Sequence, residues 1–144
     1  MTTNSPQDVV LRHIELYNDG TPEIYGTERF LEVWADDAVQ EFMPSAQFPN
    51  GMVYVGNAQI RENHAQVARL WRNRRLDVHD VIASGDRVVV RYTWSAVAAA
   101  GLPKVPAGQT LRLECADFFT VNGGLITRMV EIVGPPLLGA GGIP

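Results

Sequence analysis

The spacing of apolar residues changes near Trp71, and this change constrains the fold more than any other feature of the chain. Before it, apolar side chains recur every three or four residues, as on one face of an α-helix. After it, they alternate with polar side chains over several runs, as in half-buried β-strands. Helices followed by a run of strands predict an α+β domain with a mainly antiparallel sheet.

Three N-terminal helices are predicted. The first begins at Ser5-Pro6-Gln7-Asp8, because a capping serine, a proline and an acidic residue stand in the order of a helix start. Its apolar stripe is Val9, Val10, His13, Ile14 and Tyr17. The second helix is predicted over Thr27 to Trp34, and the third runs from a capping Asn57 to about Trp71.

The predicted strands are 38–43 after the second helix, then 75–83, 87–97, 110–121 and 125–133. The last two form a hairpin about Asn122-Gly123-Gly124. A long twisted sheet that curls around helices makes a cone, whose inside is a natural pocket for a small apolar molecule. Residues 1–133 are predicted to form this single domain, and residues 134–144 a tail of Gly, Pro and Leu without a pattern of its own.

Charge and composition exclude several classes of function. The net charge of −4 argues against nucleic acid as a partner, since phosphate binding needs a concentrated basic surface. Cys115 is the single cysteine, so no internal disulfide can form, and the three histidines lack acids at metal-ligand spacing. No apolar run reaches membrane-spanning length, and the N-terminal residues lack the charged-then-apolar pattern of a signal peptide. We therefore expect a cytoplasmic protein with no metal, cofactor or membrane partner.

Asp117 is the candidate site residue that the pattern itself reveals. On its side of the strand every other residue is apolar, and these residues are Leu111, Leu113, Cys115, Phe119 and Val121. A carboxyl group among core residues must find a partner, keep its proton or border a cavity. The last arrangement is how enzymes obtain acids and bases that act near neutral pH.

The partner of Asp117 depends on the register of the hairpin. With a two-residue turn in which Val121 pairs with Gly124, Asp117 faces Arg128 and forms an ordinary ion pair that pins the sheet. With a three-residue loop, Asp117 faces Met129, and Glu131 lies on the same apolar wall. Asn-Gly-Gly is compatible with both turns, and a slip of one residue exchanges every partner.

Several short strings, in their order and spacing over nearly the whole chain, resemble the nuclear transport factor 2-like superfamily, with the SnoaL-like cyclase and ketosteroid isomerase branches the most similar. The strings are Tyr17-Asn18-Asp19-Gly20, Trp34-Ala35-Asp36-Asp37-Ala38-Val39, Val55-Gly56-Asn57-Ala58-Gln59-Ile60-Arg61, Pro106-Ala107-Gly108 and Asp117-Phe118-Phe119 leading to Gly124-Leu125-Ile126. The resemblance implies a curved sheet around a deep apolar pocket, in a homodimer formed through the sheet. It favours the register that places Asp117 and Glu131 on one wall.

The resemblance also implies roles for individual residues. Asp117 matches the isomerase position of a protonated acid that stabilises an oxyanion. Glu131 matches the proton-transfer acid of the cyclases, and His13 matches the isomerase tyrosine that completes the oxyanion site. The isomerase base would fall near Phe42, where no acid stands. Arg91-Tyr92-Thr93 departs from the Arg-x-Asp pair of the epoxide hydrolase branch.

We predict that His13, Asp117 and Glu131 are catalytic and that seven further residues line the substrate pocket. The seven are Tyr17, Trp34, Phe42, Trp71, Arg91, Phe119 and Met129. Each has a structural alternative, because buried aromatic residues are ordinary core, and Arg91 can point to solvent or serve as a counter-ion.

Two functions are open at this stage. The first is a cofactor-independent enzyme that cyclises, isomerises or dehydrates an apolar, polyketide- or terpenoid-like carbonyl compound. Glu131 would move a proton while Asp117 and His13 polarise the carbonyl. The second is a non-catalytic module of the same fold that binds a ligand or a protein.

Overall fold

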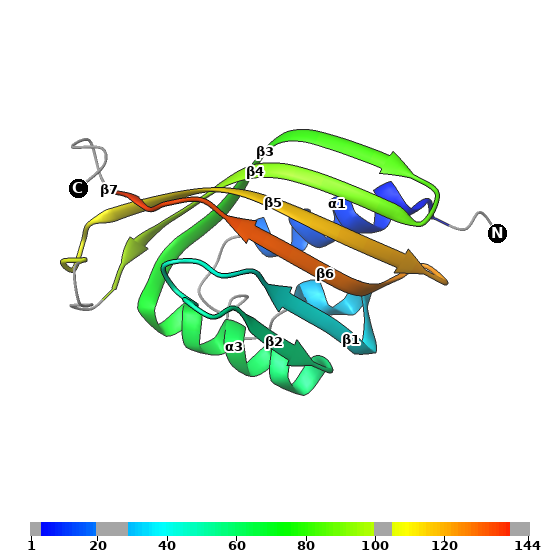
Figure 1. Ribbon diagram of the computed structural model, residues 1–144, viewed down its shortest axis with the longest axis horizontal. Coiled ribbons are helices and arrows are strands. Elements are labelled where there is room, and N and C mark those ends of the chain that lie inside the picture. Colours follow the sequence, from blue (N-terminus) through cyan, green and yellow to red (C-terminus); the bar gives the residue numbers. More distant parts are fainter. Residues whose placement is uncertain (1–3, 20–28, 100–104, 139–144) are drawn as a thin grey trace.

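The computed structural model describes residues 4–19, 29–99 and 105–138. Figure 1 shows the order of its elements, which are α1 (Pro6–Asn18), the 3-10 helix η1 (Arg29–Val33), β1 (Trp34–Phe42), β2 (Met52–Val55), α3 (Asn57–Leu70), β3 (Trp71–Ser84), β4 (Arg87–Ala98), β5 (Thr110–Asn122), β6 (Leu125–Val133) and β7 (Leu137–Leu138).

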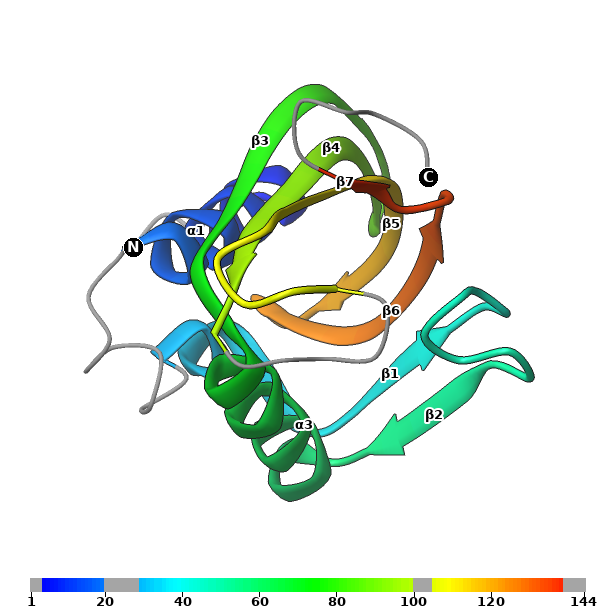
Figure 2. The ribbon, with the colours of Figure 1, turned by 90° about the vertical axis from the view of Figure 1, so that its left-hand side faces the viewer.

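Six strands form one sheet in the order β2-β1-β6-β5-β4-β3, and the short β7 pairs with β5. β1 and β6 run parallel, while the other neighbouring pairs are antiparallel. The sheet curls strongly, and α1 and α3 lie on its concave side, between β3 and β1 (Figure 2). The predicted α+β class and curved, mainly antiparallel sheet are therefore confirmed.

The start of α1 follows the sequence prediction. The Ser5 hydroxyl accepts a hydrogen bond from the Asp8 amide at 3.1 Å, and the Asp8 carboxylate accepts one from the Ser5 amide at 3.3 Å. This reciprocal pair satisfies backbone donors that a helix start otherwise leaves unpaired. The predicted stripe is buried, with Leu16 added to it.

The predicted count of three helices is wrong for the residues that the structure describes, which hold two α-helices and the short η1. Thr27 and Glu28, at the start of the predicted second helix, lie outside these residues. Trp34, at its predicted end, is already extended and pairs with Ile126 of β6. Val33-Trp34 fits a strand as well as a helix, and pairing with β6 decides between them.

Two boundaries and one additional strand next to α3 also differ from the prediction. Gly56, with φ of +85°, is the residue before the helix, and Asn57 is its first residue instead of its cap. β2 was not predicted because it is short and mostly exposed, and so lacks an apolar alternation. β3 begins at Trp71, immediately after α3, several residues before the predicted start.

The core lies between the concave face of the sheet and the helices. It combines residues of α1, η1 and α3 with alternate residues of the central strands, including Val10, Ile14, Phe30, Trp34, Ile60, Val88, Val90, Tyr92, Phe119, Ile126 and Met129. Leu137 and Leu138, from the predicted tail, pair with β5. No helix among the described residues is long and apolar enough to cross a membrane.

Candidate active site

The β5–β6 hairpin carries an irregularity that positions the site. Gly123 and Gly124 form a two-residue turn with φ of +59° and +78°, a conformation that favours glycine. Asn122 pairs with Leu125 and Val121 with Ile126, but Thr120 then pairs with Arg128. Thr127 is therefore an extra residue, a β-bulge.

The bulge places Asp117 directly opposite Glu131. Neither predicted pairing is correct, because Asp117 faces neither Arg128 nor Met129, but Asp117 and Glu131 do lie on one face, as the second register predicted. Arg128 points to the other face of the sheet, where it forms an ion pair with Glu41 of β1. The interpretation of Asp117 as a structural partner of Arg128 is therefore excluded.

Tyr92 of β4 joins the two carboxyl groups and is a site residue that the sequence did not reveal. Its hydroxyl oxygen lies 3.0 and 3.1 Å from the two carboxyl oxygens of Asp117 and 2.8 Å from Oε1 of Glu131. Tyr92 is 2 % exposed and Asp117 3 %. On β4 and β5, Val90 pairs with Asp117, so Tyr92 is its diagonal neighbour on the inner face.

The proton count of this cluster determines its charge. A phenol has one proton, so Tyr92 can donate to only one of the three carboxyl oxygens around it. Ionised carboxylates only accept hydrogen bonds, and two of them here would leave lone pairs facing each other. The contacts are satisfied when one carboxyl group keeps its proton, which gives the cluster a single negative charge.

The electrostatics assign that proton to Asp117. Burial raises the pKa of Asp117 well above its ordinary value, and the neighbouring Glu131 raises it further. Burial also raises the pKa of Glu131, but hydrogen bonds from Tyr92 and Asp117 lower it in part. Burial and both carboxyl groups raise the pKa of Tyr92, so the phenol stays protonated. The cluster thus contains two proton donors, Tyr92 and Asp117, and one carboxylate, Glu131.

His13 lies elsewhere in the core, and no described contact joins it to the carboxyl pair. Its Nδ1 accepts a hydrogen bond from Nε1 of Trp34 at 3.1 Å. Its ring is enclosed by four aromatic side chains, those of Tyr17, Phe30, Trp34 and Phe119. Burial lowers the pKa of His13 to about 3, so the ring is neutral, with its proton on Nε2.

The other predicted pocket residues lie in different parts of the structure. Phe42 pairs directly with Glu131 across β1 and β6, and Met129 pairs with Phe119 in the buried core. Trp71 packs edge-on against Trp94, whose Nε1 donates to the Tyr17 hydroxyl at 2.9 Å.

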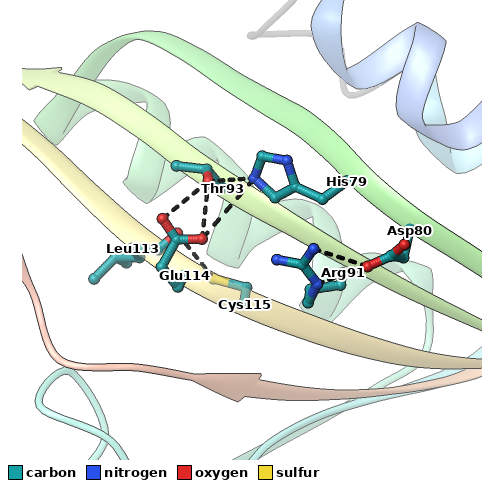
Figure 3. A network of polar contacts seen from close by, with 7 residues as sticks. All are labelled: His79, Asp80, Arg91, Thr93, Leu113, Glu114 and Cys115. Atoms are coloured by element: carbon teal, nitrogen blue, oxygen red, sulfur yellow. Dashed lines mark hydrogen bonds and ion pairs between the residues drawn. The ribbon is translucent and has the colours of Figure 1, made fainter.

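The prediction that Arg91 lines the pocket on the inner face is wrong. Its side chain is 58 % exposed, and its guanidinium pairs with Asp80 at 2.8 Å on the outer face of the sheet (Figure 3). Strand alternation explains this, because Tyr92 occupies the inner face and its neighbours must point outward.

A polar groove of about 560 Å³ lies on this outer face, lined by Asp77, His79, Arg91, Thr93, Ser95, Arg112 and Glu114. Nε2 of His79 lies 2.7 Å from the Thr93 hydroxyl, which donates in turn to Glu114 at 2.9 Å (Figure 3). These side chains are exposed, and such contacts contribute little in water. The buried cluster on the opposite face is the stronger candidate for chemistry.

Cys115 lies next to the cluster on β5. Cys115 pairs with Tyr92 across β4 and β5, and burial and the nearby carboxyl groups raise the pKa of its thiol, so it stays protonated. Among residues 4–19, 29–99 and 105–138, no three His, Cys, Asp or Glu side chains gather as a metal site would need.

Solved structures define the class of fold. The chain is similar to a protein of Silicibacter sp. TM1040 described provisionally as a polyketide cyclase, with 20 % identity, 93 % of this chain and 92 % of that chain covered, and a TM-score of 0.72. A similarly described protein of Xanthomonas campestris has 26 % identity, 88 % of both chains covered and a TM-score of 0.69. A Catenulispora acidiphila protein with a ketosteroid isomerase-like fold has 16 % identity, coverage of 86 % and 83 %, and a TM-score of 0.64. The fold is thus that of the ketosteroid isomerase-like, nuclear transport factor 2-like proteins.

Residues 10–129 match the model of the SnoaL-like domain. The chain therefore belongs to the SnoaL-like domain family, as its sequence strings predicted. No curated protein matches the chain significantly.

Proposed function

We propose that the chain is a cofactor-independent enzyme that enolises an apolar carbonyl compound as the first step of a cyclisation, isomerisation or dehydration. The observation that supports this most is the cluster of Tyr92, Asp117 and Glu131, which joins two proton donors to one carboxylate in a buried setting. Enolisation needs a base for the α-proton and donors for the oxygen that becomes negative, and the cluster supplies both.

The roles follow from the protonation states. Glu131 takes a proton from the carbon next to the carbonyl group, and the electron pair of that C–H bond moves into the enolate. Tyr92 and protonated Asp117 donate hydrogen bonds to the enolate oxygen, the role first assigned to Asp117 and His13. The enolate then takes a proton at another carbon of a conjugated chain, attacks a second carbonyl carbon to close a ring, or expels a β-hydroxyl group. The proton that Glu131 removed passes to that carbon, to the new alkoxide, or to the departing hydroxyl group, which leaves as water.

The surroundings of Glu131 favour an apolar substrate. Phe119 and Met129 are buried at 1 % and 3 % exposure, while Glu131 and Val133, further along the same face, are partly exposed. Leu113 and Trp94 are also partly buried and pack against the core. The carboxylate therefore lies where the packed core gives way to accessible apolar surface, and we place the substrate pocket there.

The absence of an acid at Phe42 does not leave the site without a base. Phe42 is where the isomerase resemblance would place the base, and Glu131 is its direct partner on the neighbouring strand. The carboxylate thus reaches the same region from one strand away. The epoxide hydrolase route has no comparable substitute, because Arg91 points outward.

The proposal is tested by following exchange of the α-hydrogens of α-tetralone, an apolar bicyclic ketone, in heavy water by proton NMR. Wild type should catalyse exchange, and Glu131→Gln should lose it. Glu41→Gln is the matched control, since it removes a carboxylate from the outer face of the neighbouring strand. Exchange that is unaffected by Glu131→Gln would exclude this carboxylate as the base.

The alternative is a non-catalytic ligand-binding module, and one observation favours it. Tyr92, Asp117 and Glu131 already satisfy one another without a ligand, as a purely structural network would. In that case no ketone would exchange its α-hydrogens, and Asp117→Asn would leave ligand affinity intact.

We also propose that the chain forms a homodimer through the outer face of its sheet. Apolar side chains are exposed there, with Ile82 at 66 % and Ile132 at 48 %, among charges of both signs that can complement a second copy. Sedimentation should show a dimer, and Phe118→Arg, near the middle of this face, should give a monomer with unchanged helix content. The cytoplasmic location stays a prediction.

A further inference from the structure

A second polar pair lies on the concave side, away from Tyr92. Gln40 of β1 is 2 % exposed, and its Nε2 lies 3.3 Å from Nε2 of His64 on α3. The His64 ring packs edge-on against Phe30 with 4.6 Å between centroids. The proposed mechanism uses neither side chain.

Each member of this pair has a buried atom without a hydrogen-bond partner. Oε1 of Gln40 and Nδ1 of His64 make none with any residue that the structure describes. Folded proteins rarely leave buried polar atoms unpaired, because such atoms lose their hydrogen bonds to water and gain nothing in return. A Met and a Phe would fill the same space without this cost, so the two polar groups call for a role outside packing.

In either orientation of the Gln40 amide, one of the two unpaired atoms is a hydrogen-bond donor and the other is an acceptor. If the Gln40 amide nitrogen donates to Nε2 of His64, the neutral ring carries its proton on Nδ1, and Oε1 is a free acceptor. If the oxygen and nitrogen of the Gln40 amide exchange places, Nε2 of His64 donates to the amide oxygen. Nδ1 is then a free acceptor, and the amide nitrogen of Gln40 is a free donor. Burial, Arg74 and His13 lower the pKa of His64 to about 3, so the ring is neutral in both arrangements.

The register of β1 and β6 places Gln40 one diagonal step from Glu131 on the inner face of the sheet. Phe42 pairs with Glu131, and Gln40, two residues earlier on the same face, pairs with Met129. One such diagonal step across a sheet is roughly 8 Å, from the spacing of strands and the rise per residue. A bicyclic ketone has this length.

We propose that Gln40 and His64 bind a hydroxyl group of the substrate, so that the substrate is a hydroxylated ketone and not a plain one. This rests on the proposed function, which places the carbonyl group at Tyr92 and Asp117. A hydroxyl group both donates and accepts, and so it can satisfy whichever atom faces it. A second carbonyl or an ether oxygen would satisfy only the donor. Hydrogen bonds in such a dry site discriminate strongly against a ligand that lacks the group.

The test compares the binding of α-tetralone with that of its ring-hydroxylated derivatives, by calorimetry. Wild type should bind at least one phenolic derivative about tenfold more tightly than the parent ketone, the factor that one ordinary net hydrogen bond contributes. The double variant Gln40→Met/His64→Phe should lose this preference and bind α-tetralone unchanged. Replacing both partners together leaves neither unpaired, so its melting temperature should equal or exceed that of wild type.

The outcomes separate this proposal from the proposed function. Equal binding of all the ketones by wild type would overturn the hydroxyl site alone, and so would a preference that survives in the double variant. Tyr92→Phe should weaken the binding of plain and hydroxylated ketones alike, because it removes a hydroxyl group that donates to the carbonyl oxygen. If wild type binds none of the ketones, both proposals are wrong.

Discussion

Asp117 and Glu131 face each other across β5 and β6, and the phenol of Tyr92 lies against both. Two carboxyl groups this close cannot both ionise readily, so their environments separate their roles into a retained proton and a carboxylate. Catalytic carboxyl pairs in enzymes depend on this division between acid and base.

The two carboxyl groups should respond unequally to amide substitution. Glu131→Gln removes the base, and the rate of α-hydrogen exchange should fall by about 10²- to 10⁴-fold. Asp117→Asn keeps an N–H donor in place of the carboxylic acid, so we expect a loss of about tenfold, the equivalent of one weakened hydrogen bond. Exchange rates of both variants, measured beside Glu41→Gln, check the order. A larger loss for Asp117→Asn would reverse the assignment of acid and base.

Tyr92→Phe should slow exchange by about 10²-fold, since it removes one donor to the developing oxyanion. Loss of its hydrogen bonds should also raise the pKa of Glu131, because those bonds stabilise the carboxylate. The acidic limb of the pH–rate profile should therefore move to higher pH. Tyr54→Phe is the control, since its ring packs with Phe42 and Phe48. An unmoved limb would show that Tyr92 does not bond Glu131 in solution.

Asp117 should make the fold less stable as the pH rises. In the unfolded chain the pKa of Asp117 has its ordinary value of 3.8, whereas the folded protein holds the proton to higher pH, so between these points the folded state binds one more proton. Stability should fall by about 1.4 kcal/mol per pH unit from that point up to the raised pKa. The difference in urea stability between wild type and Asp117→Asn should show this slope. A difference that does not depend on pH would mean that Asp117 ionises normally.

His13 should make the fold less stable as the pH falls. Burial lowers its pKa from 6.5 to about 3, so below about pH 6.5 the unfolded chain binds a proton that the folded protein does not. Its contribution should therefore weaken stability by about 1.4 kcal/mol per pH unit as the pH falls through that range. His13→Phe should remove one such increment from the urea-measured pH dependence, even if its absolute stability is lower.

The class of fold could be read from the sequence because it depends on local patterns. The capping box at Ser5 and the alternation in β5 are set by neighbouring residues, and both are present in the structure. The start of β1 was misjudged because Val33-Trp34 suits helix or strand, and only pairing with β6 decides. The errors thus fall where a distant strand determines the local conformation.

The composition of the candidate site was harder to predict. Asp117 stood out because it interrupts an apolar face, but Tyr92 is an ordinary member of an alternating strand. Its place beside Asp117 depends on the register of β4 and β5, and the connection between these strands is too long for its turn residues to fix that register. One clue was available, since a tyrosine on an inner face needs a partner for its hydroxyl group.

The extra residue Thr127 makes the chemistry of the inner face depend on the length of one strand. If the hairpin kept the regular pairing of its turn, Asp117 would face Val130, and Arg128 would turn inward while Glu131 turned outward. Whether this extra residue leaves the ladder as a bulge or stays in it therefore decides between an acidic and a cationic interior, with no substitution. We expect relatives that carry the same residues but pair this strand without the bulge to present a different set of side chains to the interior.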